Sequence, residues 1–322
     1  IASRQKNNRL EAAVALSSGK LEQLTGNSTA ATGHYIHGMA LADRLSDASL
    51  QSRIAASAGQ LSLQAGDYSS ADSYLARAGV ATGKLPASRD KAYLLIRVAR
   101  LQLQLAEFLP ESAAPLTRAA YAGLQAAEQV ADRLGDPRAR SWSLGYLGEL
   151  YESQGRFEEA IDLTRRAIYA IQGLHAPEVL FRWEWQQGRL LNAKADRENA
   201  IRAYGNAIHT LHSVRTELAA SLEQSRKSYH RLVGPLYLEY ADLLLQEGEA
   251  ATDPAESQLK LVEAREAVEL MKTVELQDYF QDDCVSLARS RVKGLEETLS
   301  ANTAVVYPIL FPDRTDMLVS TS

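Results

Sequence analysis

Small residues recur at one fixed spacing along this chain, and that spacing limits what it can fold into. Gly148 is followed by Ala160 after 12 positions and by Ala167 after 7 more. Large side chains at such points would hold two packed helices apart, because well-packed cores resist added volume. The same spacing recurs in two further sets and, more loosely, in a third: Gly59, Ala71 and Ala78; Gly188, Ala200 and Ala207; and Ala99, Ala120 and Ala127. Self-similarity of this kind predicts an array of helical hairpins.

The clearest copy lies between Ser141 and Gln172. Apolar residues at helical spacing predict two helices with facing apolar stripes, Leu144, Leu147 and Tyr151 on the first and Ile161 and Ile168 on the second. Between them, Gln154-Gly155-Arg156 forms a short break in which the glycine can take the left-handed conformation. This stretch therefore predicts two short helices packed against each other.

These positions resemble the tetratricopeptide repeat. The match in the Ser141 copy covers Leu144, Leu147, Gly148, Tyr151, Gly155, Phe157, Ala160 and Ala167, whereas Gln172 stands where the family usually has proline. The Gly59 and Gly188 copies match less completely. The resemblance implies an all-α fold, a tetratricopeptide-like superhelical solenoid of helical hairpins, with a curved surface that binds proteins or peptides.

Composition narrows the functional classes. The chain has 322 residues, 46% of them hydrophobic, and a net charge of -5. That charge argues against nucleic acid as a partner, because binding phosphates needs clustered Lys and Arg. No apolar run approaches the roughly 20 residues of a membrane helix. Because the sequence begins with Ile1, we expect a processed or excised chain; a cytoplasmic location is favoured, and export stays open if a signal peptide was removed.

Further along the chain, the pattern departs from a regular repeat. The apolar series after Ala207 predicts one helix of about 30 residues from Arg197 to Lys227, and Gly234-Pro235 is expected to precede a separate short helix. A final helix is expected over Gln281–Leu299. The period then changes to that of strands, so residues 305–311 and 317–319 predict a short C-terminal β-hairpin.

A second resemblance concerns this end of the chain. Residues 274–285 and the run from Thr303 to Leu310 look like the junction between tetratricopeptide repeats and a CHAT domain in bacterial proteins. The segment Arg182-Trp183-Glu184-Trp185-Gln186, at the start of the Gly188 hairpin, is also similar to that group. The resemblance implies a repeat solenoid over residues 1–300 and the β-hairpin start of a truncated CHAT-like, caspase-like domain over 301–322. In that family the catalytic His and Cys lie beyond these strands, so this chain is expected to have no catalytic residue and not to be an enzyme itself.

The cysteine and the histidine pairs are expected to have no catalytic or metal-binding role. Cys284, the one cysteine, follows Asp282-Asp283, and neighbouring carboxylates raise a thiol pKa, so we expect a packed structural thiol. The pairs His34/His37 and His209/His212 have a spacing that can share a metal, but no further ligand lies nearby in sequence. We therefore expect no metal and no cofactor.

The partner site is predicted from the repeat resemblance. In that family, positions 2, 5, 9 and 12 of each first helix line a concave groove. The groove residues predicted here are Trp142, Glu149, Glu152, Arg182, Trp185, Arg189 and Asn192, with Arg53, Gln60 and Leu63 from an earlier hairpin. Trp and Arg flanked by polar groups are typical of binding hot spots. Packing between repeats is the alternative reading for Trp183 and Trp185.

Three functions stay open from sequence. The first is a protein-interaction module that binds a protein or peptide in its groove and positions or regulates a C-terminal peptidase-like domain. The second is the regulatory half of a caspase-like cysteine peptidase. The third is an oligomerising scaffold in which the long helix after Ala207 pairs with a copy of itself. Neither a nucleic acid nor a membrane is expected as a partner, and the oligomeric state is open.

Overall fold

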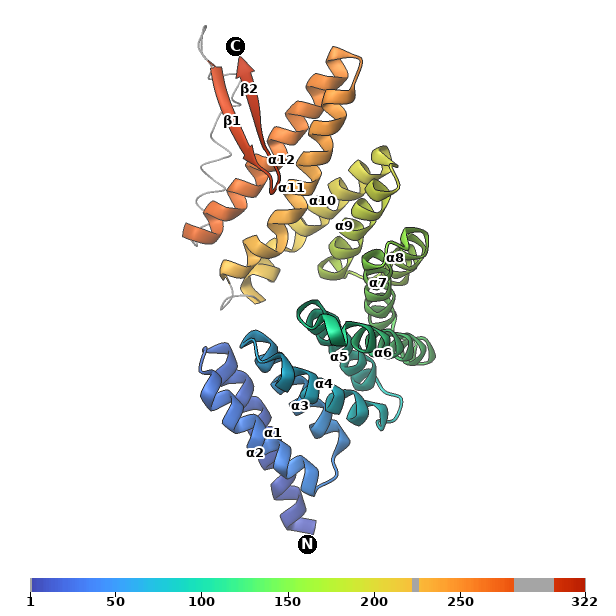
Figure 1. The fold of residues 1–322 in the computed structure, drawn as a ribbon, viewed down its shortest axis with the longest axis vertical. Coiled ribbons are helices and arrows are strands. Elements are labelled where there is room, and N and C mark those ends of the chain that lie inside the picture. The colour runs from blue at the N-terminus through green and yellow to red at the C-terminus, as the bar shows by residue number, and fades with distance from the viewer. Residues whose placement is uncertain (1, 222–225, 281–303, 322) are drawn as a thin grey trace. The chain divides into compact units, whose positions relative to one another are not determined.

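The protein is a series of helices followed by one β-hairpin (Figure 1). The computed structural model describes residues 2–221, 226–280 and 304–321. The helices are α1 (Ala2–Leu24), α2 (Ser28–Arg44), α3 (Ala48–Gln64), α4 (Tyr68–Gly83), α5 (Arg89–Phe108), the 3-10 turn η1 (Pro110–Ser112), α6 (Ala113–Leu134), α7 (Pro137–Ser153), α8 (Phe157–Ile171), α9 (Pro177–Ala193), α10 (Arg197–Ser221), α11 (Arg226–Ala250) and α12 (Pro254–Phe280). The chain divides into two compact units, unit 1 (Ile1–Val179) and unit 2 (Leu180–Ser322).

Unit 1 consists of four helical hairpins, α1/α2, α3/α4, α5/α6 and α7/α8. Short polar residues start most of its helices: the side chains of Asn27, Asp47 and Asp136 accept hydrogen bonds from the first-turn amides of α2, α3 and α7. Ser88 caps α5, and its Oγ accepts from the amide of Lys91. Gly135 ends α6 in the left-handed conformation, with φ 60°.

The predicted small-residue spacing sets the distance between the helices of each hairpin. Ala71, Ala78, Ala160, Ala167, Ala200 and Ala207 are all fully buried. A Cβ on Gly59 would lie 2.9 Å from Leu75 Cδ2, and one on Gly188 would lie 2.9 Å from the ring of Tyr204. No real side chain fits at such distances without displacing its neighbour, so the glycines are required by close helix contact.

The structure adds a fourth position to this spacing. The residue 16 places after each glycine is buried: Leu75 after Gly59, Thr164 after Gly148 and Tyr204 after Gly188. The first hairpin follows the full rule with Gly19, Ala31, Tyr35 and Gly38, and a Cβ on Gly19 would lie 2.5 Å from Tyr35 Cε1. The repeat therefore begins with α1/α2, one hairpin earlier than the three sets found in the sequence.

Unit 2 contains the longer helices α10, α11 and α12, and its core has two parts. The first joins α9, α10 and α11 through residues such as Phe181, Tyr204 and Tyr237. The second joins α11 and α12 to the β-hairpin through Leu244, Ala264 and Ile309. Residues 222–225 lie outside the described residues, so the predicted continuation of α10 to Lys227 stays a prediction.

The predicted break at Gly234-Pro235 is wrong. α11 runs through Pro235 as one helix of 25 residues. A proline inside a helix removes one hydrogen bond, but the ring of Pro235 is exposed while Val233, Leu236 and Tyr237 beside it are buried. Burial of this face holds the helix together where local preference alone would end it.

The predicted C-terminal hairpin is confirmed. Strand β1 (Ala304–Leu310) pairs antiparallel with β2 (Thr315–Thr321), with Val306 opposite Val319 and Pro308 opposite Met317. The predicted helix over Gln281–Leu299 lies outside the described residues, and the domain boundary at residue 300 stays a prediction. Among the helices that the structure describes, none is long and apolar enough to span a bilayer.

Candidate functional site

Basic side chains from three successive first helices of unit 1 come together on one face. They are Lys20 of α1, Arg53 of α3 and Arg97 of α5. Arg97 Nη2 donates to Gln60 Oε1 at 2.9 Å and to Ser57 Oγ at 3.2 Å, both neutral groups on α3. Arg53 forms an ion pair with Asp90. Arg53 and Gln60 were predicted to line a groove, whereas Lys20 and Arg97 were not identified from the sequence.

The electrostatics of this basic face favour a negatively charged ligand. Burial lowers the pKa of Arg97, and burial together with the charges of Arg97 and Arg53 lowers the pKa of Lys20. Within the described parts of the chain, neither Lys20 nor Arg97 makes an ion pair. An anion placed among these three side chains would relieve their mutual repulsion.

The predicted α7 residues lie on a neighbouring part of unit 1. Trp142 is half-buried and stacks on Tyr146, with ring centroids 5.4 Å apart. Arg100 of α5 lies over the other aromatic, its Cζ 4.7 Å from the centroid of the Tyr146 ring. Glu149 is exposed and Glu152 is half-buried on the same helix. Trp142 is therefore a half-buried aromatic side chain that packs on the buried Tyr146 and has both signs of charge nearby.

In unit 2 the predicted residues lie along α9. Trp185 Nε1 donates to Glu239 Oε2 of α11 at 2.7 Å, and the hydroxyl of Tyr204 from α10 donates to the same oxygen at 3.1 Å. The guanidinium of Arg189 lies 5.2 Å from the centroid of the Trp185 ring. The half-buried Trp185 therefore links α9 to α11 and also contacts the guanidinium of Arg189.

The remaining α9 residues occupy different environments. Arg182 is half-buried, 5.3 Å from the centroid of the Phe181 ring, and Asn192 is exposed at the C-terminal end of the helix. Trp183 is only 2% exposed, which fits the packing role considered for it. Trp142, Glu149 and Glu152 belong to unit 1 and Arg182, Trp185, Arg189 and Asn192 to unit 2, so each set is described by itself, and a single groove built from both stays a prediction.

A buried carboxylate accompanies this surface of α9. Burial raises the pKa of Glu184, although a hydrogen bond with Thr210 and the nearby His209 act in the opposite direction. Glu184 Oε2 is buried without a hydrogen-bond partner in the described part of the molecule. Ionisation of Glu184 in unit 2 is therefore energetically unfavourable.

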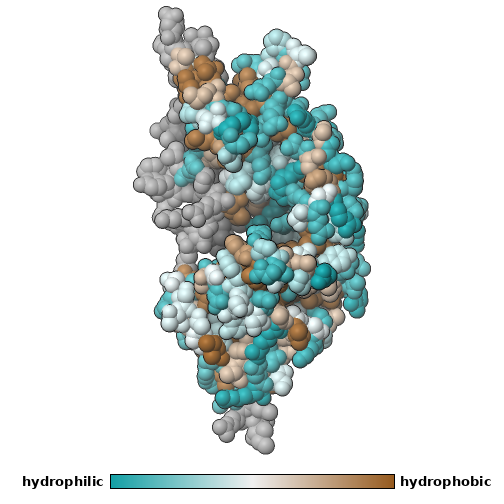
Figure 2. All heavy atoms as spheres, viewed as in Figure 1, coloured by the Kyte–Doolittle hydropathy of each residue, from teal (hydrophilic) through white to brown (hydrophobic). Residues whose placement is uncertain are grey.

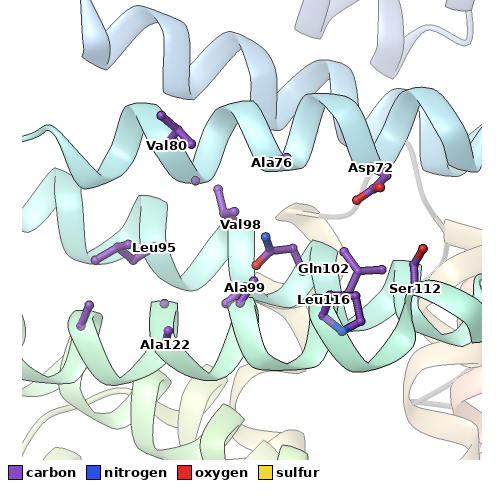
Figure 3. Close-up of a pocket in the computed structure, with 15 residues that line it drawn as sticks. Asp72, Ala76, Val80, Leu95, Val98, Ala99, Gln102, Ser112, Leu116 and Ala122 are labelled. Carbon is purple, nitrogen blue, oxygen red and sulfur yellow. The ribbon is translucent and has the colours of Figure 1, made fainter.

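A separate hollow of about 500 Å³ lies in unit 1 between α4 and α6, with α5 as its floor (Figure 3). Figure 3 shows Val80 and Ala76 along one wall, Val98, Ala99 and Gln102 on the floor, and Leu116 and Ala122 on the other wall. Small residues on both walls leave the space open, among them Gly79, Ala119, Gly123 and Ala126. The Ala- and Gly-rich stretch of α6 was the sequence signal for it, and it was not recognised.

The histidine pairs do not form an evident metal centre. His209 and His212 line a pocket of about 350 Å³ together with Glu263 and Glu266 of α12 and Tyr240 of α11. Burial and the two glutamates raise the pKa of Tyr240 to about 12. Over the residues that the structure describes, no three His, Cys, Asp or Glu side chains are arranged to hold a metal ion. His37 contacts Glu11 at 2.9 Å, and Cys284 lies outside the described residues.

Comparison with known proteins identifies the fold. No family model matches the chain, and no curated protein matches it. Among solved structures, the apo form of RapI is similar with a TM-score of 0.52 and 12% identity, covering 80% of this chain and 99% of that one. The TPR-like repeats of a kinesin light chain from Podosopora anserina are similar with a TM-score of 0.50 and 15% identity, covering 66% of this chain and 97% of that one.

Similarity at this level of identity shows the fold alone, and the comparisons show no catalytic family and no CHAT domain for this chain. They confirm the predicted fold class. The chain is an all-α, tetratricopeptide-like series of helical hairpins that ends in a short β-hairpin.

Proposed function

We propose that this chain is a protein-interaction module that binds an acidic peptide or protein segment on the first-helix face of unit 1. The observation that carries the proposal is the convergence of Lys20, Arg53 and Arg97 from three hairpins. Hydrogen bonds to Ser57 and Gln60 hold the guanidinium of Arg97, and an ion pair with Asp90 holds that of Arg53, so these two groups are positioned before a ligand arrives. Preorganisation of this kind reduces the entropy lost on binding.

The neutral partners of Arg97 support this role. Its guanidinium is oriented by Ser57 and Gln60, which fix its geometry without neutralising its charge. A carboxylate can accept two parallel hydrogen bonds from a guanidinium, which makes arginine well suited to recognising acidic side chains. The acidic partner follows from this charge, although the chain as a whole carries a net charge of -5.

In unit 2 we propose a second anchoring surface at Trp185 and Arg189, bordered by Arg182 and Asn192, and in unit 1 an aromatic one at Trp142, bordered by Glu149 and Glu152. Large aromatic side chains next to arginine often contribute most of the binding energy at an interface. The contact of Arg189 with the Trp185 ring supports this assignment. Because Trp185 also donates to Glu239, Arg189→Ala tests binding with less disturbance of the packing than Trp185→Ala does.

The test uses the full chain and a phage-displayed library of random twelve-residue peptides. Selection is expected to enrich peptides rich in Asp and Glu, and a selected peptide should lose at least tenfold in affinity for Arg97→Met and for Lys20→Met. The matched control is Arg118→Gln, which removes an exposed positive charge from α6 in the same unit. Equal affinity for all three variants, or no enrichment of acidic peptides, would refute the proposal.

We further propose that the module positions or regulates a C-terminal peptidase-like domain in the protein from which it comes. The β1–β2 hairpin supports this, because its outward face is apolar and suits contact with another protein layer. The sequence of the whole protein provides the test: a His and a Cys downstream of the hairpin would support the role, and their absence would remove it.

A further inference from the structure

The two edges of the C-terminal hairpin differ in their capacity to pair with another strand. The backbone N–H of Phe311 donates to the carbonyl of Arg314 at 2.8 Å, which closes the turn. Hydrogen-bonded and non-hydrogen-bonded pairs alternate along an antiparallel ladder. From the register, the pairs whose amides and carbonyls face outward are Leu310/Thr315, Pro308/Met317 and Val306/Val319.

Pro308 weakens the capacity of the β1 edge to pair with another strand. Proline has no N–H, so the outer edge of β1 lacks a donor at its centre. The outer edge of β2 presents Thr315, Met317 and Val319 in succession, with neither proline nor lysine within the strand. Proteins usually protect an edge strand with such residues, and β2 has neither.

Among the described residues, a groove runs along the outer edge of β2. It has a volume of about 540 Å³ and is lined by all six residues from Thr315 to Ser320, that is, by both faces of β2. α11 and α12 form the far side of the groove and contribute three apolar residues, Leu245, Leu261 and Val262, and three polar ones, Glu249, Gln258 and Arg265. An added strand could thus pair with β2 while its alternate side chains rest on a floor of mixed polarity.

The outward face of the hairpin is apolar. Val306, Leu310, Met317 and Val319 are all exposed, between 49% and 73%. Figure 2 shows brown, hydrophobic atoms gathered over the hairpin. A third strand beside β2 would extend this apolar face, and a sheet of three strands is more stable than one of two.

We propose that the outer edge of β2 is a strand-addition site for a single extended segment of a partner protein. The segment would span about six residues, with apolar side chains at the positions that meet Leu245, Leu261 and Val262. A basic residue would suit the exposed Glu249, which makes no ion pair within the described residues. Main-chain hydrogen bonds would supply affinity and the floor would supply specificity.

A second copy of this chain is a poorer occupant. If two β2 strands paired antiparallel across a two-fold axis, both copies would place their helices on the same face of the joined sheet. Because α11 and α12 extend past the β2 edge, the helices of the two copies would compete for the same space. The groove therefore fits one strand better than a strand that carries its own supporting helices.

The test uses two matched proline variants of the full chain. Val319→Pro removes an outward N–H from the β2 edge, whereas Val306→Pro removes one from the β1 edge at the same cross-strand pair, and both side chains are exposed. A phage-displayed library of random seven-residue peptides is selected against the unmodified chain. A selected peptide should lose at least tenfold in affinity for Val319→Pro and less than threefold for Val306→Pro.

A second arm checks the binding mode. Methylation of alternate backbone nitrogens of the selected peptide should abolish binding in one of the two alternating sets and spare it in the other, as expected when only one edge of the peptide pairs. No enrichment of any peptide would overturn the proposal, as would equal loss in both proline variants. A dimer of the unmodified chain in sedimentation that Val319→Pro dissociates would assign the edge to a second copy instead.

Discussion

Two hairpins, one in each unit, use the same packing device and differ in the chemistry around it. In α1/α2 the ring of Tyr35 lies over Gly19, and in α9/α10 the ring of Tyr204 lies over Gly188. The hydroxyl of Tyr35 donates to the neutral Gln23 of its own hairpin at 2.8 Å. The hydroxyl of Tyr204 donates to the charged Glu239 of the next hairpin at 3.1 Å.

The comparison shows that different residues determine the spacing of the helices and the chemistry of their surface. The glycine and the buried ring set how closely the helices approach, and they do so equally in both units. Residues outside that pattern decide what the first-helix face offers: uncompensated cations at Lys20 and Arg97 in unit 1, and a carboxylate already engaged by Trp185 and Tyr204 in unit 2. We infer that unit 1 is the more receptive of the two to an external charge.

The largest effect should come from breaking the shared packing device. Gly188→Val and Gly19→Val force a branched side chain into a tyrosine ring, and each should lower the free energy of unfolding by about 3 kcal/mol. Gly33 provides the control, because a Cβ there would meet nothing within 4 Å. Gly33→Ala should stabilise the chain by about 0.5–1 kcal/mol through helix propensity. Chemical denaturation measures all three, and a neutral Gly188→Val would contradict the packing argument.

The next effect should distinguish the two tyrosine hydroxyls. Glu239→Ala leaves the donors of Trp185 and Tyr204 without their acceptor and should destabilise unit 2 by about 2 kcal/mol. Gln23→Ala removes one neutral acceptor at a partly exposed site and should cost about 1 kcal/mol or less. Hydrogen–deuterium exchange over α9–α11 and over α1–α2 measures the two separately. Equal losses would mean that the charge of Glu239 contributes nothing.

A third prediction concerns the buried carboxyl group of unit 2. The raised pKa of Glu184 means that the folded state holds more protons than the unfolded chain above pH 4.5, the ordinary value for this group. The stabilising contribution of protonated Glu184 is therefore complete below pH 4.5 and is lost as pH rises through the raised pKa.

Glu184→Met should remove this pH dependence and raise stability at pH 7 by less than about 1 kcal/mol, because the unsatisfied Oε2 is removed at the cost of the hydrogen bond with Thr210. Denaturation midpoints between pH 4 and pH 8 measure the slope. Glu107→Met, at an exposed position on α5, is the control and should leave it unchanged. A slope that survives in Glu184→Met would assign it to another group.

Local patterns predicted the fold well, and long-range relations account for what was missed. The 12- and 7-residue spacings lie within one hairpin, so they were visible in the sequence. The fourth position was hidden because its residue type changes from Tyr35 to Leu75 to Thr164. Gly19 lowers the helix propensity of its segment, and only the structure shows that it is a contact point under Tyr35.

The candidate site was less accessible from sequence. Arg53 and Gln60 were placed on the groove face by their positions in the first helix, and the structure brings Arg97 to Gln60. Lys20 and Arg97 are separated by 77 positions, and nothing local marks them as neighbours. The predicted helix break at Gly234-Pro235 was wrong for a related reason. Burial on one side of α11 outweighs the local preference to end the helix.

The smallest predicted effect tests whether unit 1 carries uncompensated charge. Lys20→Met removes one of three mutually repelling cations, and because the lysine is well exposed the gain should be only about 0.3 kcal/mol at pH 7 and low salt. The gain should vanish at about 1 M salt, where the screening length falls to about 3 Å. Lys84→Met, at the C-cap of α4, should instead lose a little stability, since a cation is favourable at a helix C-terminus.

The pH dependence of that variant has a defined sign. The lowered pKa of Lys20 means that the unfolded chain holds more protons between that pKa and 10.5, so the stability of the unmodified chain rises with pH through this window. The advantage of Lys20→Met should shrink over the same range. If Lys20→Met is less stable than the unmodified chain at low salt, then Lys20 already has an internal counter-charge. Unit 1 would then carry no uncompensated charge at this position, and the contrast with unit 2 would be wrong.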